Sequence, residues 1–484
     1  MNIHHAKLSP SVSIQTDSIY LEKLRYLLSQ DMDFHNQDTG YASHNFHSFP
    51  AKFPPQLPRE FIQNLTSPGD IVLDPMMGSG TTLLEAFLLG RQGIGFDIDP
   101  LALLLSRTKT TSLDLRRVAQ TGNRIIAQAR QAVIKNQVEL KKEITKRWDL
   151  KTQQFVDYWF DRDTQTALLS LLIEIKQIQE NSLRAFFELV FSAIIITKSG
   201  GVSLALDLAH TRPHRARIVV DQNDQFVLGT PLDDQKIRHP KFATKKLRSP
   251  FEEFEKRVAQ NLKGLPQNKT ACFQYHLDWI PEAKQMVSLT PVLASGSAQC
   301  MPLGDDSVDI VITSPPYASN AIDYMRAHKF SLVWFGYSID SLGEKRQNCI
   351  GGETTSDFKF EKLPRYTSQV VDRFIAQDKK KGKVLHRYYS EMTCSLREMF
   401  RVLKPGKAAI VVVGSSVMRG IDTETQTCLS EIGQTIGFQV PGIGIRAIDR
   451  NRRMMPAGTV IDLNSQIQQR LHKEYIIGFY KPNE

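Results

Sequence analysis

The residues with the clearest chemical potential follow the apolar run from Ile71 to Asp74, which ends in an acid and leads into a glycine-rich turn. In the continuation PMMGSGTT, Gly78 and Gly80 allow a tight turn and let a ligand approach the backbone. A helix that begins after this turn offers unpaired N–H groups and a partial positive charge, which suit a carboxylate or a phosphate. A second apolar run, GIGFDID, carries Asp97 at its end, where an acid can accept hydrogen bonds from a ribose diol.

Two other known glycine-rich sites fit this turn less well. A phosphate-binding P-loop requires a lysine after its last glycine, and the sequence GSGTT has none. A dinucleotide site carries GxGxxG, whereas here Asp74 precedes the turn and would repel phosphates; the same carboxylate suits the positively charged amino group of a methionyl moiety. A strand–helix turn without any ligand remains the third interpretation.

A second candidate site, TSPPY, follows the apolar run VDIVI and spans Thr313 to Tyr317. Two prolines end the strand abruptly and fix the backbone, while their carbonyl groups stay free to accept hydrogen bonds. Ser314 adds a hydroxyl group and Tyr317 a flat ring. Together these groups can hold an exocyclic amine and stack against the base that carries it; a rigid turn with an aromatic lid is the alternative.

With both motifs in one chain, the sequence resembles the S-adenosylmethionine-dependent amino-methyltransferases of DNA, which make N4-methylcytosine or N6-methyladenine. The likeness rests on DPMMGSGTT, GIGFDID and TSPPY, with FPAKFPP upstream and VLKPG downstream, and covers about residues 45–110 and 290–484. Serine in SPPY is typical of the cytosine-N4 branch. The resemblance implies site-specific methyl transfer to N4 of a cytosine flipped out of DNA; the alternatives are adenine N6, an RNA or tRNA base, and a catalytically silent nucleic-acid-binding protein.

The resemblance also implies which residues line the site. The GSG turn and Asp74 would line the methionine end of S-adenosylmethionine, Asp97 would hold its ribose, and FPAKFPP would close over the methionine moiety. The implied cofactor residues are Lys52, Phe53, Pro54, Asp74, Pro75, Gly78, Ser79, Gly80, Thr81, Asp97, Ile98, Ser297 and Thr313. The implied catalytic residues are Ser314, Pro315, Pro316 and Tyr317. No metal is required by this chemistry.

The charge distribution favours a polyanionic partner. The chain has 61 basic and 51 acidic residues, and residues 111–294 carry a net charge of +8 from 28 basic and 20 acidic side chains. Two arginine clusters, HTRPHRAR and DRNRRMMP, are candidate phosphate contacts. A solvated surface explains the first cluster equally well, and a salt-bridged turn explains the second at least as well. The candidate DNA-binding residues are Arg212, Arg215, Arg217, Arg452 and Arg453. We expect the DKKKGK segment, residues 378–383, to be a mobile basic loop.

These motifs require a Rossmann-like α/β methyltransferase sheet, mostly parallel with a terminal antiparallel hairpin, plus a helical basic insert. Residues 1–110 would form the N-terminal part of the catalytic domain with the cofactor motifs. Residues 111–290 would form the helical and loop-rich insert and the candidate target-recognition region. Residues 291–484 would complete the catalytic domain, with TSPPY and a loop-rich insert near 337–385. We predict three or four helices over 101–198, a hairpin over 216–229, a helix over 321–335 and final strands near 439–445 and 474–480.

Other features of the 484-residue chain exclude whole classes of protein. No run of about 18 apolar residues exists to span a bilayer, and the N-terminus lacks the apolar core of a signal peptide. Five scattered cysteines argue against structural zinc and a disulfide framework. We therefore expect a cytoplasmic protein that binds double-stranded DNA and no membrane, with a restriction endonuclease or defence system as candidate partner. The sequence gives no oligomeric state.

Overall fold

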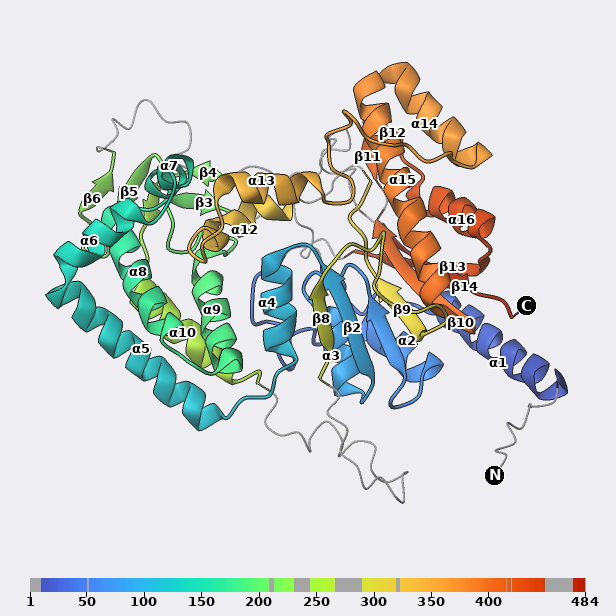
Figure 1. The fold of residues 1–484 in the computed structure, drawn as a ribbon, viewed down its shortest axis with the longest axis horizontal. Coiled ribbons are helices and arrows are strands. Elements are labelled where there is room, and N and C mark those ends of the chain that lie inside the picture. The colour runs from blue at the N-terminus through green and yellow to red at the C-terminus, as the bar shows by residue number, and fades with distance from the viewer. Residues whose placement is uncertain are drawn as a thin grey trace.

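The computed structural model describes residues 10–49, 52–208, 213–229, 244–265, 290–318, 323–414, 416–418, 420–448 and 473–483. Its centre is a seven-stranded sheet (Figure 1). The strands are β1 (Ile71–Asp74), β2 (Gln92–Asp97), β8 (Val292–Ser295), β9 (Val308–Thr313), β10 (Leu403–Gly414), β13 (Gln439–Ala447) and β14 (Lys473–Tyr480). They lie in the order β8-β2-β1-β9-β10-β14-β13, which is 3-2-1-4-5-7-6 in chain order. The first five run parallel, and β14 is antiparallel to both its neighbours, as predicted.

Alternating side chains of the central strands point to opposite faces of the sheet. Val72 and Ile310 face a core formed with α1 (Pro10–Ser29), α2 (Gln56–Leu65) and α3 (Thr81–Leu88). Leu73 and Val311 face the other core, which contains α14 (Arg365–Gln377), α15 (Lys379–Val402) and α16 (Thr425–Ile436). Because both faces are covered, the central strands are continuous apolar runs, as is typical of parallel sheets.

The helical insert follows β2 and lies on the left of Figure 1. After α4 (Pro100–Lys109), which lies beside the sheet, it contains α5 (Leu115–Lys135), α6 (Gln137–Lys146), α7 (Leu150–Trp159), α8 (Arg162–Lys176), α9 (Asn181–Ile195) and α10 (Pro250–Leu262). The prediction of three or four helices before residue 198 was wrong, since the described residues there form six. Aspartates restart the helices: the side chains of Asp114, Asp149 and Asp161 each accept hydrogen bonds from backbone N–H groups of the following first turn.

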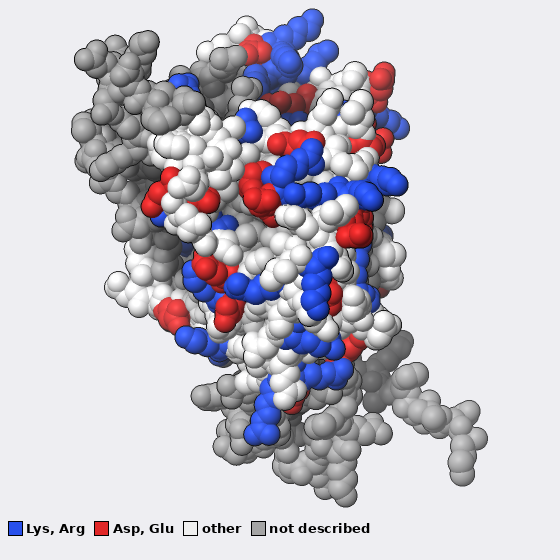
Figure 2. Space-filling model, turned by 90° about the vertical axis from the view of Figure 1, so that its left-hand side faces the viewer, with Lys and Arg blue, Asp and Glu red and all other residues white. Residues whose placement is uncertain are grey.

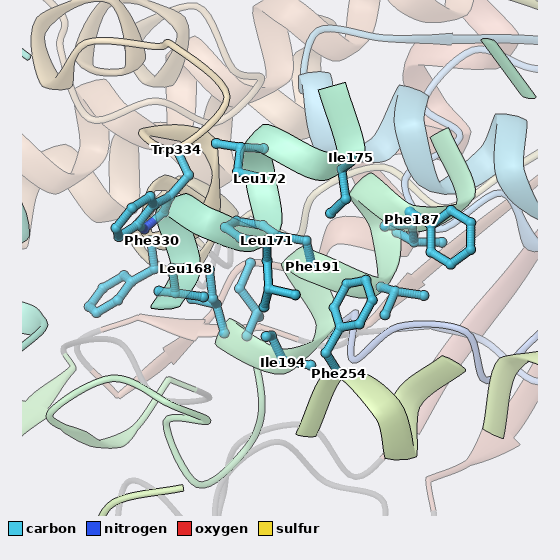
Figure 3. Packing of buried hydrophobic residues seen from close by; sticks show 14 of the residues in the cluster. Leu168, Leu171, Leu172, Ile175, Phe187, Phe191, Ile194, Phe254, Phe330 and Trp334 are labelled. Atoms are coloured by element: carbon cyan, nitrogen blue, oxygen red, sulfur yellow. The ribbon is translucent and has the colours of Figure 1, made fainter. Parts of the chain in front are cut away.

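Apolar side chains of residues 168–178 form part of the insert's core. Figure 3 shows side chains of α8, α9 and α10 facing one another, with Phe330 and Trp334 among them. Phe330 belongs to α12 (Tyr324–Leu332), and Trp334 follows it. The segment after TSPPY therefore completes the core of a region that lies more than 100 residues earlier in the chain. This α12 is shorter than the helix predicted over 321–335.

Small sheets complete the insert. The predicted hairpin is confirmed as β5 (Ile218–Val220) and β6 (Phe226–Leu228), and β7 (Thr244–Lys246) adds in parallel to β5. A second pair joins β3 (Ala205–Asp207) to β4 (His214–Arg215). A further hairpin, β11 (Val417–Met418) and β12 (Ile421–Asp422), follows β10 in the catalytic part.

The prediction of a loop-rich insert over 337–385 was wrong for much of its length. The segment contains α13 (Ile339–Gln347), α14 and the start of α15. The expected mobile loop DKKKGK is the first turn of α15, where Asp378 accepts a hydrogen bond from the N–H of Lys381. Gly382 is a reason why the sequence did not predict this helix. A Cβ at this position would lie 2.6 Å from the backbone nitrogen of Ile375, so the glycine allows α14 to pack closely.

Among the described helices, none has the length and apolarity needed to cross a membrane.

Candidate active site

Three of the predicted site residues lie at the carboxyl ends of adjacent parallel strands. Asp74 ends β1, Asp97 ends β2 and Thr313 ends β9. Because β2 and β9 flank β1 on opposite sides, the strand order reverses here. In open α/β sheets, ligands bind in the crevice outside such a reversal point. The fold therefore brings the two sequence motifs to one place, although 239 positions separate Asp74 from Thr313.

A direct hydrogen bond joins the two motifs. The Thr313 hydroxyl donates to Asp74 Oδ1 at 2.7 Å, and the same oxygen accepts the N–H of Met76 at 3.2 Å. Burial raises the pKa of Asp74 to about 6, against the effect of these hydrogen bonds. The buried carboxyl thus fixes the end of β9 relative to the glycine-rich turn.

The glycine-rich turn packs closely against its neighbours. Gly80 has a φ of 70°, and a Cβ there would lie 2.4 Å from the Ser106 hydroxyl oxygen, so no side chain fits. The N–H of Gly78 donates to Asp97 Oδ2 at 2.9 Å and thereby ties the turn to the end of β2. Lys109, which the sequence analysis missed, is fully buried, and its ammonium donates to the Ser79 carbonyl at 2.7 Å.

Asp97, which is half-buried, forms an acidic pair with the buried Asp99. Its Oδ1 accepts the N–H of Asp99 at 2.9 Å, and Asp99 Oδ2 bonds to Nδ1 of His328 at 2.5 Å. Burial, followed by the charge of Asp99, raises the pKa of Asp97 to about 7. Burial acts on Asp99 in the same direction, but the charge and hydrogen bond of His328 hold the pKa of Asp99 below its ordinary value.

Aromatic rings stand beside this acidic pair. The Phe49 ring, from FPAKFPP, stacks on Tyr324 with centroids 5.2 Å apart and lies 5.1 Å from the ring of His328. A Cβ on Gly78 would lie 3.4 Å from Phe49, so the ring also borders the glycine-rich turn. Burial, followed by the charges of Asp99 and Asp97, raises the pKa of the thiol of Cys349, in the loop after α13, to about 12.

Most of the other expected cofactor residues are shielded from solvent. Phe53, Pro54, Pro75, Ser79 and Thr81 are buried, and Ile98 is half-buried. Ser297 follows β8, where the neighbouring Gly296 N–H donates to the Asp97 carbonyl at 3.3 Å. Lys52 lies with its ammonium 3.0 Å from the His44 carbonyl, to which it donates.

The TSPPY turn is anchored to the terminal hairpin. The Tyr317 hydroxyl donates to Glu474 Oε1 at 2.7 Å, and Glu474 also forms an ion pair with Arg446 of β13. Burial and the charge of Glu474 raise the pKa of Tyr317 well above its ordinary value, while a hydrogen bond with Ser314 opposes them. Pro315 is buried, and Ser314 and Pro316 are half-buried.

The candidate DNA contacts are only partly placed. Arg215 lies over the ring of Tyr158 at 4.4 Å, and Arg217 is exposed. Arg212, Arg452 and Arg453 lie outside the described residues. Figure 2 shows basic and acidic side chains interspersed on the outer face of the molecule at the end of the insert, so on this face the excess charge is not gathered into one patch.

Several site residues had little or no signal in the sequence. Asp99 did have a signal, because an Asp immediately before Pro100 is common at the start of a helix. His328 and Glu474 bond to partners 229 and 157 positions away, so only the folded chain brings them together.

Comparisons with known proteins agree with the motifs. A protein-family model for N6/N4 methyltransferases, described as DNA methylase, matches residues 28–108. Type II methyltransferase M.MvaI of Kocuria varians is 25% identical over 84% of this chain and 84% of its own length. Type II methyltransferase M.BsoBI of Geobacillus stearothermophilus is 20% identical over 90% of this chain and 87% of its own.

Among solved structures, a DNA modification methylase of Thermus thermophilus complexed with S-adenosyl-L-methionine is 18% identical. The alignment covers 38% of this chain and 51% of that one, with a TM-score of 0.19. The family match covers the glycine-rich turn and both strand-end acids, while the two type II relatives extend over most of the chain. Residues 28–108 thus match the N6/N4 DNA methylase model, and the chain, which is similar to type II methyltransferases over most of its length, is an S-adenosylmethionine-dependent DNA methyltransferase.

Proposed function

We propose that this methyltransferase transfers the methyl group of S-adenosylmethionine to the N4 amine of a cytosine flipped out of double-stranded DNA. The observation that carries the proposal is the hydrogen bond between Thr313 and Asp74, because it holds the TSPPY turn against the cofactor motif. An amine held by TSPPY then lies next to the methionine end of the cofactor. The serine of TSPPY favours the cytosine branch over adenine N6.

The residues at the strand ends fit this cofactor. Asp74 is a buried acid suited to a positively charged amino group, and the N-terminus of α3 is suited to a carboxylate. Asp97 offers carboxylate oxygens for the ribose hydroxyls, and Ser297 lies beside it for the adenine end. Lys52, Phe53 and Pro54 would close over the methionine moiety. The remaining lining residues would be Pro75, Gly78, Ser79, Gly80, Thr81, Ile98 and Thr313. When bound, S-adenosylmethionine supplies an electrophilic methyl group on a sulfonium.

The protein's own residues would orient the amine. Its lone pair is delocalised into the ring, so it is a weak nucleophile. Hydrogen bonds from the amine to the Ser314 hydroxyl and the Pro315 carbonyl favour a more tetrahedral nitrogen, and Pro316 fixes the turn. Tyr317 offers its ring face to the flipped base. Alignment of the nitrogen with the methyl group then supplies much of the rate. Serine is a poor base, so it is not assigned proton removal before transfer.

DNA recognition is proposed for the helical insert, residues 111–290. Arg212, Arg215 and Arg217 would contact phosphates from it, and Arg452 and Arg453 would do so from the catalytic part. The type II relatives suggest pairing with a cognate restriction endonuclease. In such a system, methylation protects the sites that the endonuclease cuts.

The product identifies the target base. Full-length protein is incubated with labelled S-adenosylmethionine and duplex DNA, and the DNA is digested to nucleosides. N4-methylcytosine is the expected product. N6-methyladenine would overturn the choice of base and leave the amino-methyltransferase chemistry in place, whereas label in RNA alone would overturn the DNA substrate.

A further inference from the structure

A buried histidine stands behind the acid proposed to hold the ribose. His328 of α12 has no exposed surface, and its Nδ1 bonds to Asp99 Oδ2 at 2.5 Å. Asp99 in turn donates its backbone N–H to Asp97 Oδ1 at 2.9 Å. The three residues form a chain from α12 to the end of β2, and Asp97 is the member whose carboxyl is offered to a ligand.

Asp97 and Asp99 place two carboxyl groups close together, one half-buried and the other buried. In low-dielectric surroundings two such groups do not both ionise unless a cation compensates one of them. Within the described part of the chain, the hydrogen bonds and ion pairs of the two carboxyls include no lysine or arginine, and His328 is the basic side chain that contacts them. The ionisation of this pair therefore depends on His328.

Other titratable groups face the pair without replacing His328. They are Asp74 on β1, Tyr324 on α12, Tyr337 and Cys349 beside α13, and His47, which is itself near Arg257 and Lys109. Burial raises the pKa of the phenol of Tyr324 and of the thiol of Cys349, so both stay neutral near pH 7. Burial and the charge of His328 lower the pKa of His47 well below its ordinary value. His47 therefore adds no charge in this range.

The position of His328 is fixed by packing on two sides of its helix. Phe330 and Trp334 are buried in the core of the insert (Figure 3). On the other side the Phe49 ring lies 5.1 Å from the imidazole. The imidazole cannot turn away from Asp99 without disturbing this packing, so the ion pair is a built feature and not a surface contact.

We propose that His328 is a positioning residue for the cofactor: it neutralises Asp99, so that Asp97 remains an ionised acceptor for the ribose hydroxyls. This inference rests on the proposed function, because it takes Asp97 as the ribose contact. An ionised carboxylate accepts hydrogen bonds on both oxygens, whereas a protonated one accepts less well and donates one. Binding of the ribose therefore favours the ionised form of Asp97.

The test measures ligand affinity against pH in full-length protein. Calorimetry measures the affinity of two ligands between about pH 5.5 and 9. One is S-adenosylmethionine, and the other is 5′-methylthioadenosine, which has the ribose and adenine but no titrating amino group. In the unchanged protein, affinity should rise with pH, with a midpoint near pH 7, the pKa of Asp97, and level off about one pH unit higher.

Two variants should move this profile in opposite directions. His328→Asn keeps a donor near the position of Nδ1 but carries no charge, so the midpoint should rise by about one pH unit and affinity at pH 7 should fall about fivefold. Asp99→Asn removes the neighbouring negative charge, so the midpoint should fall. His386→Asn is the matched control. This half-buried histidine lies on α15, away from the acidic pair, and bonds to the Glu361 carbonyl.

The outcomes separate the inference from the function on which it rests. If Asp97→Ala binds both probes as tightly as the unchanged protein, Asp97 does not hold the ribose, and the assignment and the inference both fail. If Asp97→Ala loses affinity but His328→Asn keeps the original midpoint, or loses affinity equally at every pH, His328 is merely structural and the inference alone is overturned. If His328→Asn does not fold, a downward midpoint in Asp99→Asn supports the inference and an unmoved one overturns it.

Discussion

Tyr317 donates its hydroxyl hydrogen to Glu474, which lies 157 positions later on β14, at 2.7 Å. Glu474 is also paired with Arg446 on β13. The ring proposed to stack on the target base is thus held from its far end by the two antiparallel strands that close the sheet. The two strands of the terminal hairpin, which carry none of the motifs on which the family resemblance rests, take part in the geometry of the active-site turn.

This contact separates two functions of Tyr317. Tyr317→Phe keeps the ring face but removes the donor to Glu474, so we expect a loss of about 1 kcal/mol in stability and near-normal occupancy of the flipped base. Tyr317→Ala also removes the stacking face, worth roughly 1–3 kcal/mol per base. A fluorescent base analogue at the target position measures flipping. A Phe variant that flips no better than the Ala variant would contradict the stacking function.

Ser314→Ala should slow methylation by about 10²–10³, because one preorganised contact to the amine is lost. Affinity for S-adenosylmethionine should change little, since the proposed cofactor contacts lie at other strand ends. Single-turnover methylation of duplex DNA gives the rate. Ser307→Ala is the control: this serine lies just before the start of β9, where its hydroxyl bonds to the Gly304 carbonyl. Full activity in Ser314→Ala would show that the hydroxyl does not hold the amine.

Asp74→Asn should weaken binding of S-adenosylmethionine at least tenfold, because a hydrogen bond to a charged group contributes about 1.5–3 kcal/mol. Thr313→Val is the matched comparison, since it removes the hydroxyl that donates to Asp74 and leaves the carboxylate. Calorimetry measures both affinities. Equal affinity in Asp74→Asn and the unchanged protein would remove Asp74 from the cofactor site.

The raised pKa of Asp97 predicts a pH-dependent cost to the ligand-free fold. Its pKa is about 7 in the folded protein, above the ordinary value of 3.8, so the folded state holds this proton more tightly than the unfolded state. Ionisation of Asp97 therefore destabilises the folded state. This loss of stability is absent at low pH, grows between about pH 4 and 7, and is constant above pH 7. Relative to the unchanged protein, Asp97→Asn should therefore gain stability as pH rises through this window. Denaturant unfolding at several pH values measures the difference, and a difference independent of pH would contradict the raised pKa.

DNA affinity should fall with salt in proportion to the phosphates that the protein neutralises. Removing Arg212, Arg215 and Arg217 together should reduce the slope of log affinity against log salt by up to about three. The control with the same change in charge removes Arg365, Arg373 and Arg397, which lie on α14 and α15. Equal slopes in the two variants would exclude the first cluster as a DNA contact.

Sequence patterns predicted the strand ends well and the long-range partners poorly. Asp74, Asp97 and Thr313 end apolar runs, so local hydrophobicity and turn residues were enough to place them. The partners of Asp99 and Tyr317 depend on how α12 and β14 pack, which no local pattern encodes. The error at residues 337–385 has a local cause: polar residues and Gly382 read as loop, but that glycine is the contact that lets α14 pack on α15.

Helix α12 limits which segment of the chain can be exchanged in protein engineering. An exchange of residues 111–290 for another insert would remove the apolar surroundings of Phe330 and Trp334, which are buried in the core of the insert. The same exchange would loosen the helix that carries His328. A chimaera that keeps a well-ordered cofactor site would therefore need to transplant α12 together with the insert or redesign its two aromatic residues. The exchangeable unit is thus larger than the continuous insert and includes a segment from the second half of the chain.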